Sequence, residues 1–296
     1  MWFPMNLMIS GKARRVPIFG CIDRSLRKLV NRVLQWLNFV RNLKGVSTRA
    51  DVGIFISASF DIIMFMSSLW KHNPKMLFSG TYVVKPYGFY VYARSKTDDL
   101  YHAVPKREKD VHDIIINLLR NGDVFVDVGA NIGYYTILAS KIVGDRGKII
   151  SIEPISNTFK ILKFNVFKLN VLKNVKLIEN AAWHEKTTIK FSLPTGYYGI
   201  ASAVRNYKGE EVKVDTVTLD EILQPFDIIR LMKIDVEGSE YEVLLGASDA
   251  LSRTEYVVME ISRRTKECLQ LLNQNGFKCK KLKFTTCWLA MKNHKR

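Results

Sequence analysis

Cysteine is scarce in this sequence. The 296 residues contain four, Cys21, Cys268, Cys279 and Cys287, with no Cys-x-x-Cys pair and no histidine at zinc-ligand spacing beside them. Four cysteines in a chain of this length exclude a disulfide scaffold and give no support for a structural zinc site. We therefore expect a reducing, cytoplasmic setting. A disulfide between Cys279 and Cys287 across a terminal hairpin stays open at this stage.

Acidic residues are nearly missing from both ends of the chain. Residues 1–50 contain ten Lys or Arg but one acid, Asp23, and residues 262–296 contain ten Lys or Arg but one acid, Glu267. Of the net charge of +17, the two ends supply +18 and the middle supplies −1. Basic flanks favour an acidic partner, such as anionic lipid, nucleic acid or a phosphorylated substrate, or they serve only as a solubilising surface.

A secretory signal is also missing, because Pro4 and Asn6 break the apolar start and the positive charges follow it. The most apolar run, residues 52–70, carries Asp61 near its middle, where a charge costs about 2.5–3.5 kcal/mol in a bilayer. We interpret this run as an accessory helix packed on the main domain. Interfacial membrane contact is the second interpretation and a true membrane span is the third.

Residues 22–43 are predicted to form a basic amphipathic helix, with Lys and Arg on much of the surface left by the apolar stripe. Such a helix can lie on an anionic membrane. An apolar stripe more often packs on the helix's own domain, and we predict that arrangement, with peripheral membrane contact through residues 22–70 as the alternative. The stripe consists of Ile22, Leu26, Leu29, Val33, Leu37 and Val40.

Residues 123–135 are the stretch around which the rest of the chain is organised. Residues 124–128 are nearly all apolar and predict a strand buried on both faces, followed by Gly129, Gly133 and a helix over residues 134–143. A strand, a glycine turn and a helix N-terminus form a pocket for a polar or anionic ligand. Asp127 at the strand end favours a ligand that also carries positive charge or donors. The dinucleotide fingerprint needs a third glycine at the position of Asn131.

Strands and helices alternate over residues 123–275, which predicts an α/β fold with a doubly wound, mostly parallel sheet. A β-hairpin is predicted over residues 81–94. We expect two parts, a basic helical extension over residues 1–80 and a ligand-binding domain over residues 81–296.

Two further acidic signals follow predicted strands. Glu153 ends the second strand, 24 residues after Gly129, where an acid binds ribose hydroxyls in nucleotide-binding sheets. Asp235 and Glu237 follow the fourth strand and would face the pocket, where carboxylates suit general-base chemistry or hydroxyl binding. Glu240 is either a third member of this wall or an ordinary first-turn acid of a helix.

The four segments 127–133, 152–154, 214–220 and 233–240 together resemble the FkbM-type S-adenosylmethionine-dependent methyltransferases. The resemblance runs from about residue 101 to 261 and leaves residues 1–80 outside. It implies a class I methyltransferase (Rossmann-like) sheet of seven strands with an antiparallel last strand, and S-adenosyl-L-methionine as the cofactor. The cofactor residues implied are Asp127 for the ammonium, the Gly129–Gly133 turn with Asn131 for the methionine portion, Glu153 for the ribose and Ala181 for the adenine edge.

The resemblance also implies O-methylation of a small-molecule or glycan hydroxyl, on a sugar or a natural-product-like acceptor. Asp235 or Glu237 is the predicted base, with His184 as a second candidate. A divalent metal ion held by the carboxylates stays open, but no metal site is assigned because no further ligand spacing supports one. Two other classes stay open: a dinucleotide-dependent oxidoreductase, and a basic protein that binds nucleic acid or membrane on this fold. Methylation of nucleic acid is not expected, because the chain lacks an Asn/Asp-Pro-Pro-aromatic tetrapeptide. Acceptor specificity is assigned to residues 196–204 and the N-terminal extension.

Overall fold

A seven-stranded sheet forms the centre of the computed structural model, which describes residues 24–67, 75–105, 107–194, 199 and 201–293. Its strand order is β6-β5-β4-β10-β11-β13-β12, and β13 runs antiparallel to both of its neighbours. This order confirms the predicted doubly wound α/β fold with one antiparallel strand near the edge. The strands are β4 (Val124–Val128), β5 (Lys148–Ile152), β6 (Val175–Ile178), β10 (Ile229–Ile234), β11 (Thr254–Glu260), β12 (Phe277–Lys281) and β13 (Cys287–Lys292).

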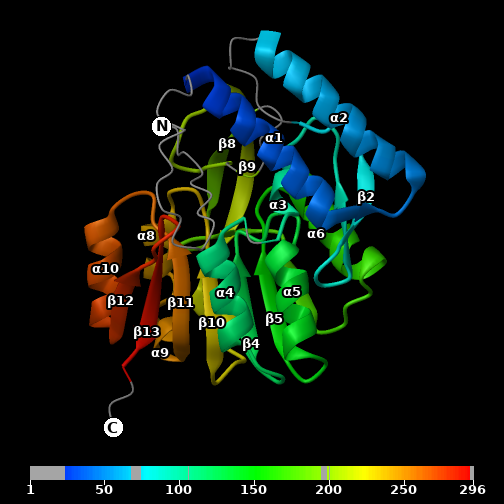
Figure 1. The fold of residues 1–296 in the computed structure, drawn as a ribbon. Coiled ribbons are helices and arrows are strands. Elements are labelled where there is room, and N and C mark those ends of the chain that lie inside the picture. Colours follow the sequence, from blue (N-terminus) through cyan, green and yellow to red (C-terminus); the bar gives the residue numbers. More distant parts are fainter. Residues whose placement is uncertain (1–23, 68–74, 106, 195–198, 200, 294–296) are drawn as a thin grey trace, which may run out of the picture.

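Helices cover both faces of this sheet (Figure 1). One hydrophobic cluster joins β4 and β5 to α4 (Lys109–Leu118), α5 (Tyr134–Val143) and α6 (Ser156–Lys163), which continues as a π-helical turn over Phe164–Leu169. The other cluster joins the sheet to α7 (Leu219–Leu223), α8 (Glu240–Leu245), α9 (Ser248–Ser252) and α10 (Thr265–Gln274). Thr218 caps α7, because its hydroxyl accepts the Glu221 N–H at 3.2 Å.

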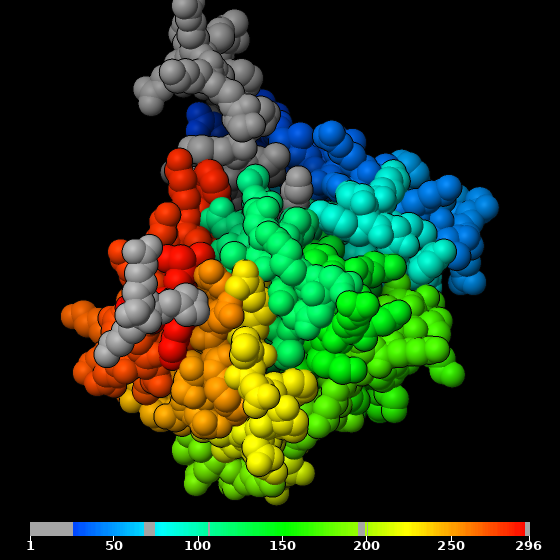
Figure 2. Space-filling view, turned by 90° about the horizontal axis from the view of Figure 1, so that it is seen from below, coloured from blue at the N-terminus to red at the C-terminus, as the bar shows by residue number. Residues whose placement is uncertain are grey.

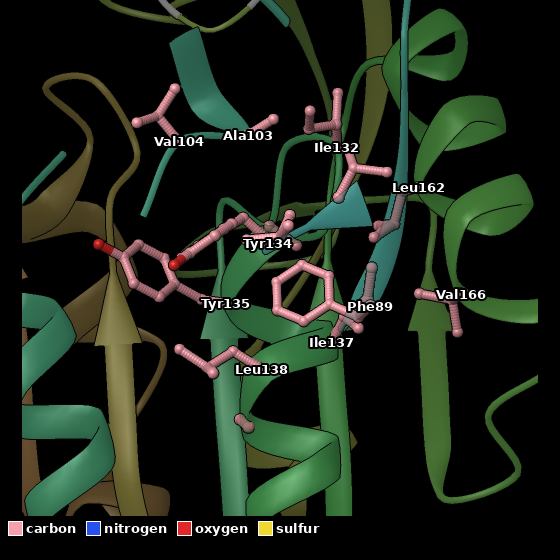
Figure 3. Packing of buried hydrophobic residues seen from close by; sticks show 14 of the residues in the cluster. Phe89, Ala103, Val104, Ile132, Tyr134, Tyr135, Ile137, Leu138, Leu162 and Val166 are labelled. Atoms are coloured by element: carbon pink, nitrogen blue, oxygen red, sulfur yellow. The ribbon is translucent and has the colours of Figure 1, made fainter. Parts of the chain in front are cut away.

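A smaller sheet ties the N-terminal part to the main domain. Strand β1 (Leu43–Gly45) pairs with β2 (Gly80–Val84), and β2 forms the predicted hairpin with β3 (Phe89–Ala93). The predicted boundary between residues 80 and 81 therefore falls inside β2, which pairs with a strand on each side. Phe89 contacts Tyr134 edge-on at 5.6 Å between ring centroids, inside a cluster of aromatic and aliphatic side chains (Figure 3). The N-terminal sheet thus shares its core with the first turn of α5.

Helices α1 (Arg24–Asn42) and α2 (Thr48–Ser67) pack on each other and on this small sheet. The predicted inward stripe of α1 was wrong at Leu26 and Leu37, which are 49% and 57% exposed. The inward face instead carries Arg32, Trp36 and Phe39. Buried polar contacts determine this orientation of α1, because Asp61 of α2 accepts a hydrogen bond from Trp36 Nε1 at 2.8 Å and pairs with Arg32.

A third sheet, β7-β9-β8, follows the main sheet's edge strand; its strands are β7 (Ala181–Ala182), β8 (Thr188–Pro194) and β9 (Gly209–Val217). The short helix α3 (Asp99–His102) connects the N-terminal hairpin to α4. In the space-filling view, the N-terminal helices and the C-terminal hairpin form opposite flanks of the visible face (Figure 2). Cys279 stands opposite Ala290 in the hairpin register, so the disulfide left open above does not form, and both Cys279 and Cys287 are free.

Candidate active site

A pocket of about 970 Å³ lies at the carboxyl ends of β4, β5 and β10. This is the point where the strand order reverses, with β5 on one side of β4 and β10 on the other. Six of the eight predicted site residues line it, and two do not. Those that line it are Gly129, Asn131, Glu153, Ala181, Asp235 and Glu237.

The glycine turn after β4 requires its first glycine. Gly129 has a φ of +79°, and a Cβ built there would lie 1.9 Å from the Asp235 backbone oxygen. The ends of β4 and β10 therefore approach so closely that no other residue fits. Asn131 also adopts the left-handed conformation, with a φ of +50°, which Asn tolerates better than most residues. Gly133, with a φ of +95°, immediately precedes α5 and does not line the pocket.

Glu153 is buried beside this turn and lines the pocket. Its Oε2 accepts the Asn131 N–H and its Oε1 accepts the Ile155 N–H, both at 3.0 Å. Burial raises the pKa of the carboxyl to about 7, against the opposing effect of these two backbone hydrogen bonds. Each carboxylate oxygen has capacity for a further hydrogen bond, so the group can still accept from a ligand.

Asp127 is completely buried, and its carboxylate lies below the pocket rather than in its wall. Its Oδ2 accepts the Thr136 hydroxyl at 2.8 Å, and its Oδ1 lies 3.4 Å from Lys233 Nζ. In this structure the Asp127 carboxylate pairs with Lys233. Its contact with a ligand ammonium stays a prediction.

Lys233 lines the pocket and was not predicted. Its Nζ lies 3.4 Å from Asp127 Oδ1, 3.6 Å from Asp235 Oδ2 and 3.4 Å from the Gly129 carbonyl. Burial acts to lower the pKa of Lys233, but the two carboxylates outweigh it and leave that pKa raised. The sequence signal was a lysine in the mostly apolar strand Ile229–Ile234, which also contains Arg230; a buried lysine is costly unless it is paired.

Glu237 stands in a strained backbone conformation, with a φ of +51°. Such outliers cluster at functional sites. Its side chain pairs with Arg205 at 3.2 Å, and its carbonyl accepts the Ser202 hydroxyl at 2.7 Å. Burial, followed by the charges of Asp235 and Glu260, raises the pKa of Glu237 to about 8.

Three carboxylates, Glu108, Asp235 and Glu260, converge so that one oxygen of each lies within 4.8 Å of the others. Glu108 and Glu260 were not predicted, although Glu260 ends strand β11 as Glu153 follows β5. Each member has a partner in the structure: Arg107 at 2.7 Å from Glu108, Lys233 beside Asp235, and the Thr286 hydroxyl at 2.5 Å from Glu260. These contacts satisfy the cluster with protein groups.

Of the remaining residues considered in the sequence, one lines the pocket and two do not. Ala181 lines the pocket with Ala182 and Trp183. His184 does not line it; this side chain is 39% exposed and lies 3.3 Å from Glu185. Glu240 also lies outside, where it accepts the Gly238 N–H at 2.8 Å at the start of α8. Of the histidines in the described ranges, His102 lines the pocket, and sequence reasoning missed it.

Strand order, glycine turn and pocket acid together define the class I methyltransferase architecture. A family model described as "Methyltransferase FkbM domain" matches residues 127–279, just over half of the chain. The chain belongs to this family. The match begins at Asp127 and ends within β12, so it contains the whole pocket wall contributed by β4, β5 and β10.

Three curated relatives, 25%, 28% and 32% identical to this chain, are also named as methyltransferases. The chain is similar to "Hexuronic acid methyltransferase AglP" from Haloferax volcanii, 25% identical over 172 residues, covering 52% of this chain and 62% of that protein. It is similar to "31-O-demethyl-FK506 methyltransferase FkbM" from Streptomyces tacrolimicus, 28% identical over 193 residues, covering 54% and 74%. It is also similar to "Probable cobalt-precorrin-6B C(15)-methyltransferase (decarboxylating)" from Sulfurisphaera tokodaii, 32% identical over 156 residues, covering 48% and 80%.

Proposed function

We propose that this protein is an S-adenosylmethionine-dependent methyltransferase that transfers a methyl group to a hydroxyl of a sugar, glycan or natural-product-like acceptor. The observation that carries the proposal is the position of Glu153. Its buried carboxylate lines the pocket, accepts the Asn131 N–H of the glycine turn at 3.0 Å and lies at the switch point of the sheet.

In this proposal, Glu153 binds the two ribose hydroxyls, one on each carboxylate oxygen. The Gly129–Asn131 backbone and the Asp235 carboxylate bind the methionine portion. Its ammonium needs a negative partner, which is Asp235, and its carboxylate needs a positive one, which is Lys233. Ala181 and Ala182 form the adenine wall. The cofactor would supply an electrophilic methyl carbon on a sulfonium, so alignment of the acceptor oxygen contributes much of the rate.

The acceptor hydroxyl must lose its proton as the new oxygen–carbon bond forms. We propose that Glu237 or Asp235 accepts this proton; both line the pocket on the side of β10. A carboxyl with a pKa of about 8, such as Glu237, is close to the optimum for a general base near neutral pH.

Two of the relatives are named as methyltransferases of a hexuronic acid and of an O-demethyl compound, which supports a hydroxyl acceptor. The third is named as a C(15)-methyltransferase, so transfer to carbon is the alternative. A screen with labelled cofactor against uronic acids, neutral sugars and polyketide-like alcohols tests this. Nuclear magnetic resonance of the product then distinguishes a methoxy from a C-methyl group.

Cofactor binding is tested separately by calorimetry with S-adenosylmethionine, its demethylated product and NAD. We expect binding of the first two and none of NAD. Glu153→Gln should weaken that binding about 10- to 100-fold, the cost of one or two charge-assisted hydrogen bonds. Glu179→Gln, an exposed acid just after β6, is the matched control and should bind like the wild type.

A further inference from the structure

Helix α2 buries two polar side chains and exposes many apolar ones. Its inward face carries Ser57 and Asp61, which are 0% and 1% exposed, beside the buried apolar residues Ile54 and Phe65. Its outward face carries large apolar side chains that are 43–64% exposed and recur every three or four residues, on one side of the helix. These residues are Val52, Phe55, Ile56, Phe60, Ile63 and Met66.

Specific contacts hold α2 in this orientation. Asp61 binds Trp36 Nε1 and Arg32 of α1. The Ser57 hydroxyl donates to the Gly53 carbonyl at 2.6 Å and accepts the Leu77 N–H at 3.0 Å. Rotating α2 to bury its apolar face would break these buried polar contacts, so the exposed face is a fixed feature of the fold.

Helix α1 repeats the pattern. Leu26, Val30, Leu34 and Leu37 lie on its outward side and are 41–57% exposed. With α2, this makes ten large apolar side chains at the surface of one helical pair, far more than scattered exposed residues on a soluble monomer. Thr48–Ser67 is also long and apolar enough to cross a membrane by length and composition, the only such helix in the described ranges.

The charges beside this apolar surface have one sign. Arg27, Lys28, Arg41, Lys44 and Arg49 are all exposed on or between the two helices. The two acids of residues 24–67 are engaged within the unit: Asp61 as above, and Asp51 by the Gly45 N–H at 2.7 Å. Apolar faces flanked by exposed cations are the pattern of an interfacial membrane surface.

We propose that the outward faces of α1 and α2 dock on an anionic lipid bilayer, with the apolar side chains in the interfacial region and the cations at the headgroups. A second copy of the chain fits this surface less well, because symmetric pairing would bring the same cations together. The buried contacts of α2 keep it on the domain, so one helix face meets lipid while the other stays on protein.

The proposed membrane surface lies at the same end of the molecule as the pocket. Helices α1 and α2 lie at the end of the molecule toward which the parallel strands point, and the pocket lies at that same edge of the sheet (Figure 1). Docking therefore turns the pocket's end of the molecule toward the membrane. The inference stands on surface residues alone and does not depend on methyl transfer.

Sedimentation of the full chain with vesicles tests the proposal. We expect binding to vesicles of phosphatidylcholine with phosphatidylglycerol, little binding to phosphatidylcholine alone, and loss of binding as salt rises. Phe55→Ser with Ile63→Ser should weaken binding at least about tenfold. Arg27→Glu with Lys28→Glu should weaken it and flatten the salt dependence.

Matched controls come from outside the helical pair. Val171→Ser with Ile228→Ser changes two side chains that are 66% and 62% exposed, and Lys176→Glu reverses one exposed charge; all should leave vesicle binding unchanged. Thermal unfolding of each variant shows that it is folded.

Three results would overturn the proposal. One is wild-type protein that sediments with anionic vesicles no more than without them. Another is equal binding by the Phe55/Ile63 and Val171/Ile228 variants. The third is a dimer, without vesicle binding, that the Phe55/Ile63 change dissociates, which would assign the surface to a second copy. As a further measurement, brominated lipid should quench the tryptophan fluorescence of the Ile63→Trp variant more than that of the wild type.

Discussion

Lys233 and Asp127 are register partners on the adjacent parallel strands β10 and β4, and Lys233 Nζ lies 3.4 Å from Asp127 Oδ1. Both side chains are buried, at 4% and 0% exposure. The same ammonium lies 3.6 Å from Asp235 in the pocket. The pair therefore sets a buried positive charge at the boundary between the core of the sheet and the site.

Removing one member of this pair should be more harmful than removing both. Asp127→Ala leaves Lys233 buried with Asp235 as its remaining ion-pair partner. Breaking a buried pair costs about 3–5 kcal/mol of unfolding free energy. Asp127→Ala with Lys233→Met removes the stranded charge and should recover part of that loss. Urea unfolding of the two single variants and the double variant measures the coupling; additive losses would contradict it.

Gly129 should tolerate no side chain. An alanine Cβ there would lie 1.9 Å from the Asp235 backbone oxygen, so Gly129→Ala must separate β4 from β10 and abolish cofactor binding. Gly122→Ala is the matched control, because Gly122 also has a positive φ, +91°, but has open space around its Cβ position. It should lose only about 1–3 kcal/mol to backbone strain and keep binding in calorimetry.

Methyl transfer should increase with pH. Glu237 has a pKa raised to about 8, so it is mostly protonated at pH 7 and gains basic form as the pH passes 8. The rate should rise through that pH and then level off, and Glu237→Gln should lower it about 100-fold or more. An unchanged profile in Glu237→Gln would transfer the base assignment to Asp235, for which Asp235→Asn is the test.

Glu153 should make stability decrease with pH. Its folded-state pKa of about 7 lies above the usual value of 4.5 for a glutamate, so the folded state binds the extra proton between these pH values. Stability from this group is complete below pH 4.5 and is lost as the pH rises through 7, by up to about 3 kcal/mol. Chemical unfolding at a series of pH values should show this slope in wild type and a flatter one in Glu153→Gln. Equal slopes would contradict the assignment.

The central strands and the pocket could be predicted because their signals are local. Residues 124–128 and 134–143 form a strand and a helix with the predicted bounds, since a short apolar run, a glycine turn and a helix period are each readable in sequence. Glu153, Asp235 and Glu237 follow strand ends, and parallel strands bring their carboxyl ends to one edge.

What could not be predicted depends on partners distant in sequence. The orientation of α1 is set by Asp61, 25 residues beyond Trp36, and hydrophobic periodicity cannot show which face a buried acid selects. Lys233 was missed for a similar reason, because its partner Asp127 lies on a neighbouring strand 106 positions earlier. Glu108 approaches Asp235 and Glu260 from α4's N-terminal flank only through the tertiary fold.

The most direct test of the account is the affinity of the intact protein for S-adenosylmethionine, measured by calorimetry in wild type, Glu153→Gln and the Glu179→Gln control. The account predicts binding in wild type, a loss of about 10- to 100-fold in Glu153→Gln, and no change in Glu179→Gln. No binding by the wild type, or equal affinities in all three proteins, would contradict the assignment of this pocket as the cofactor site.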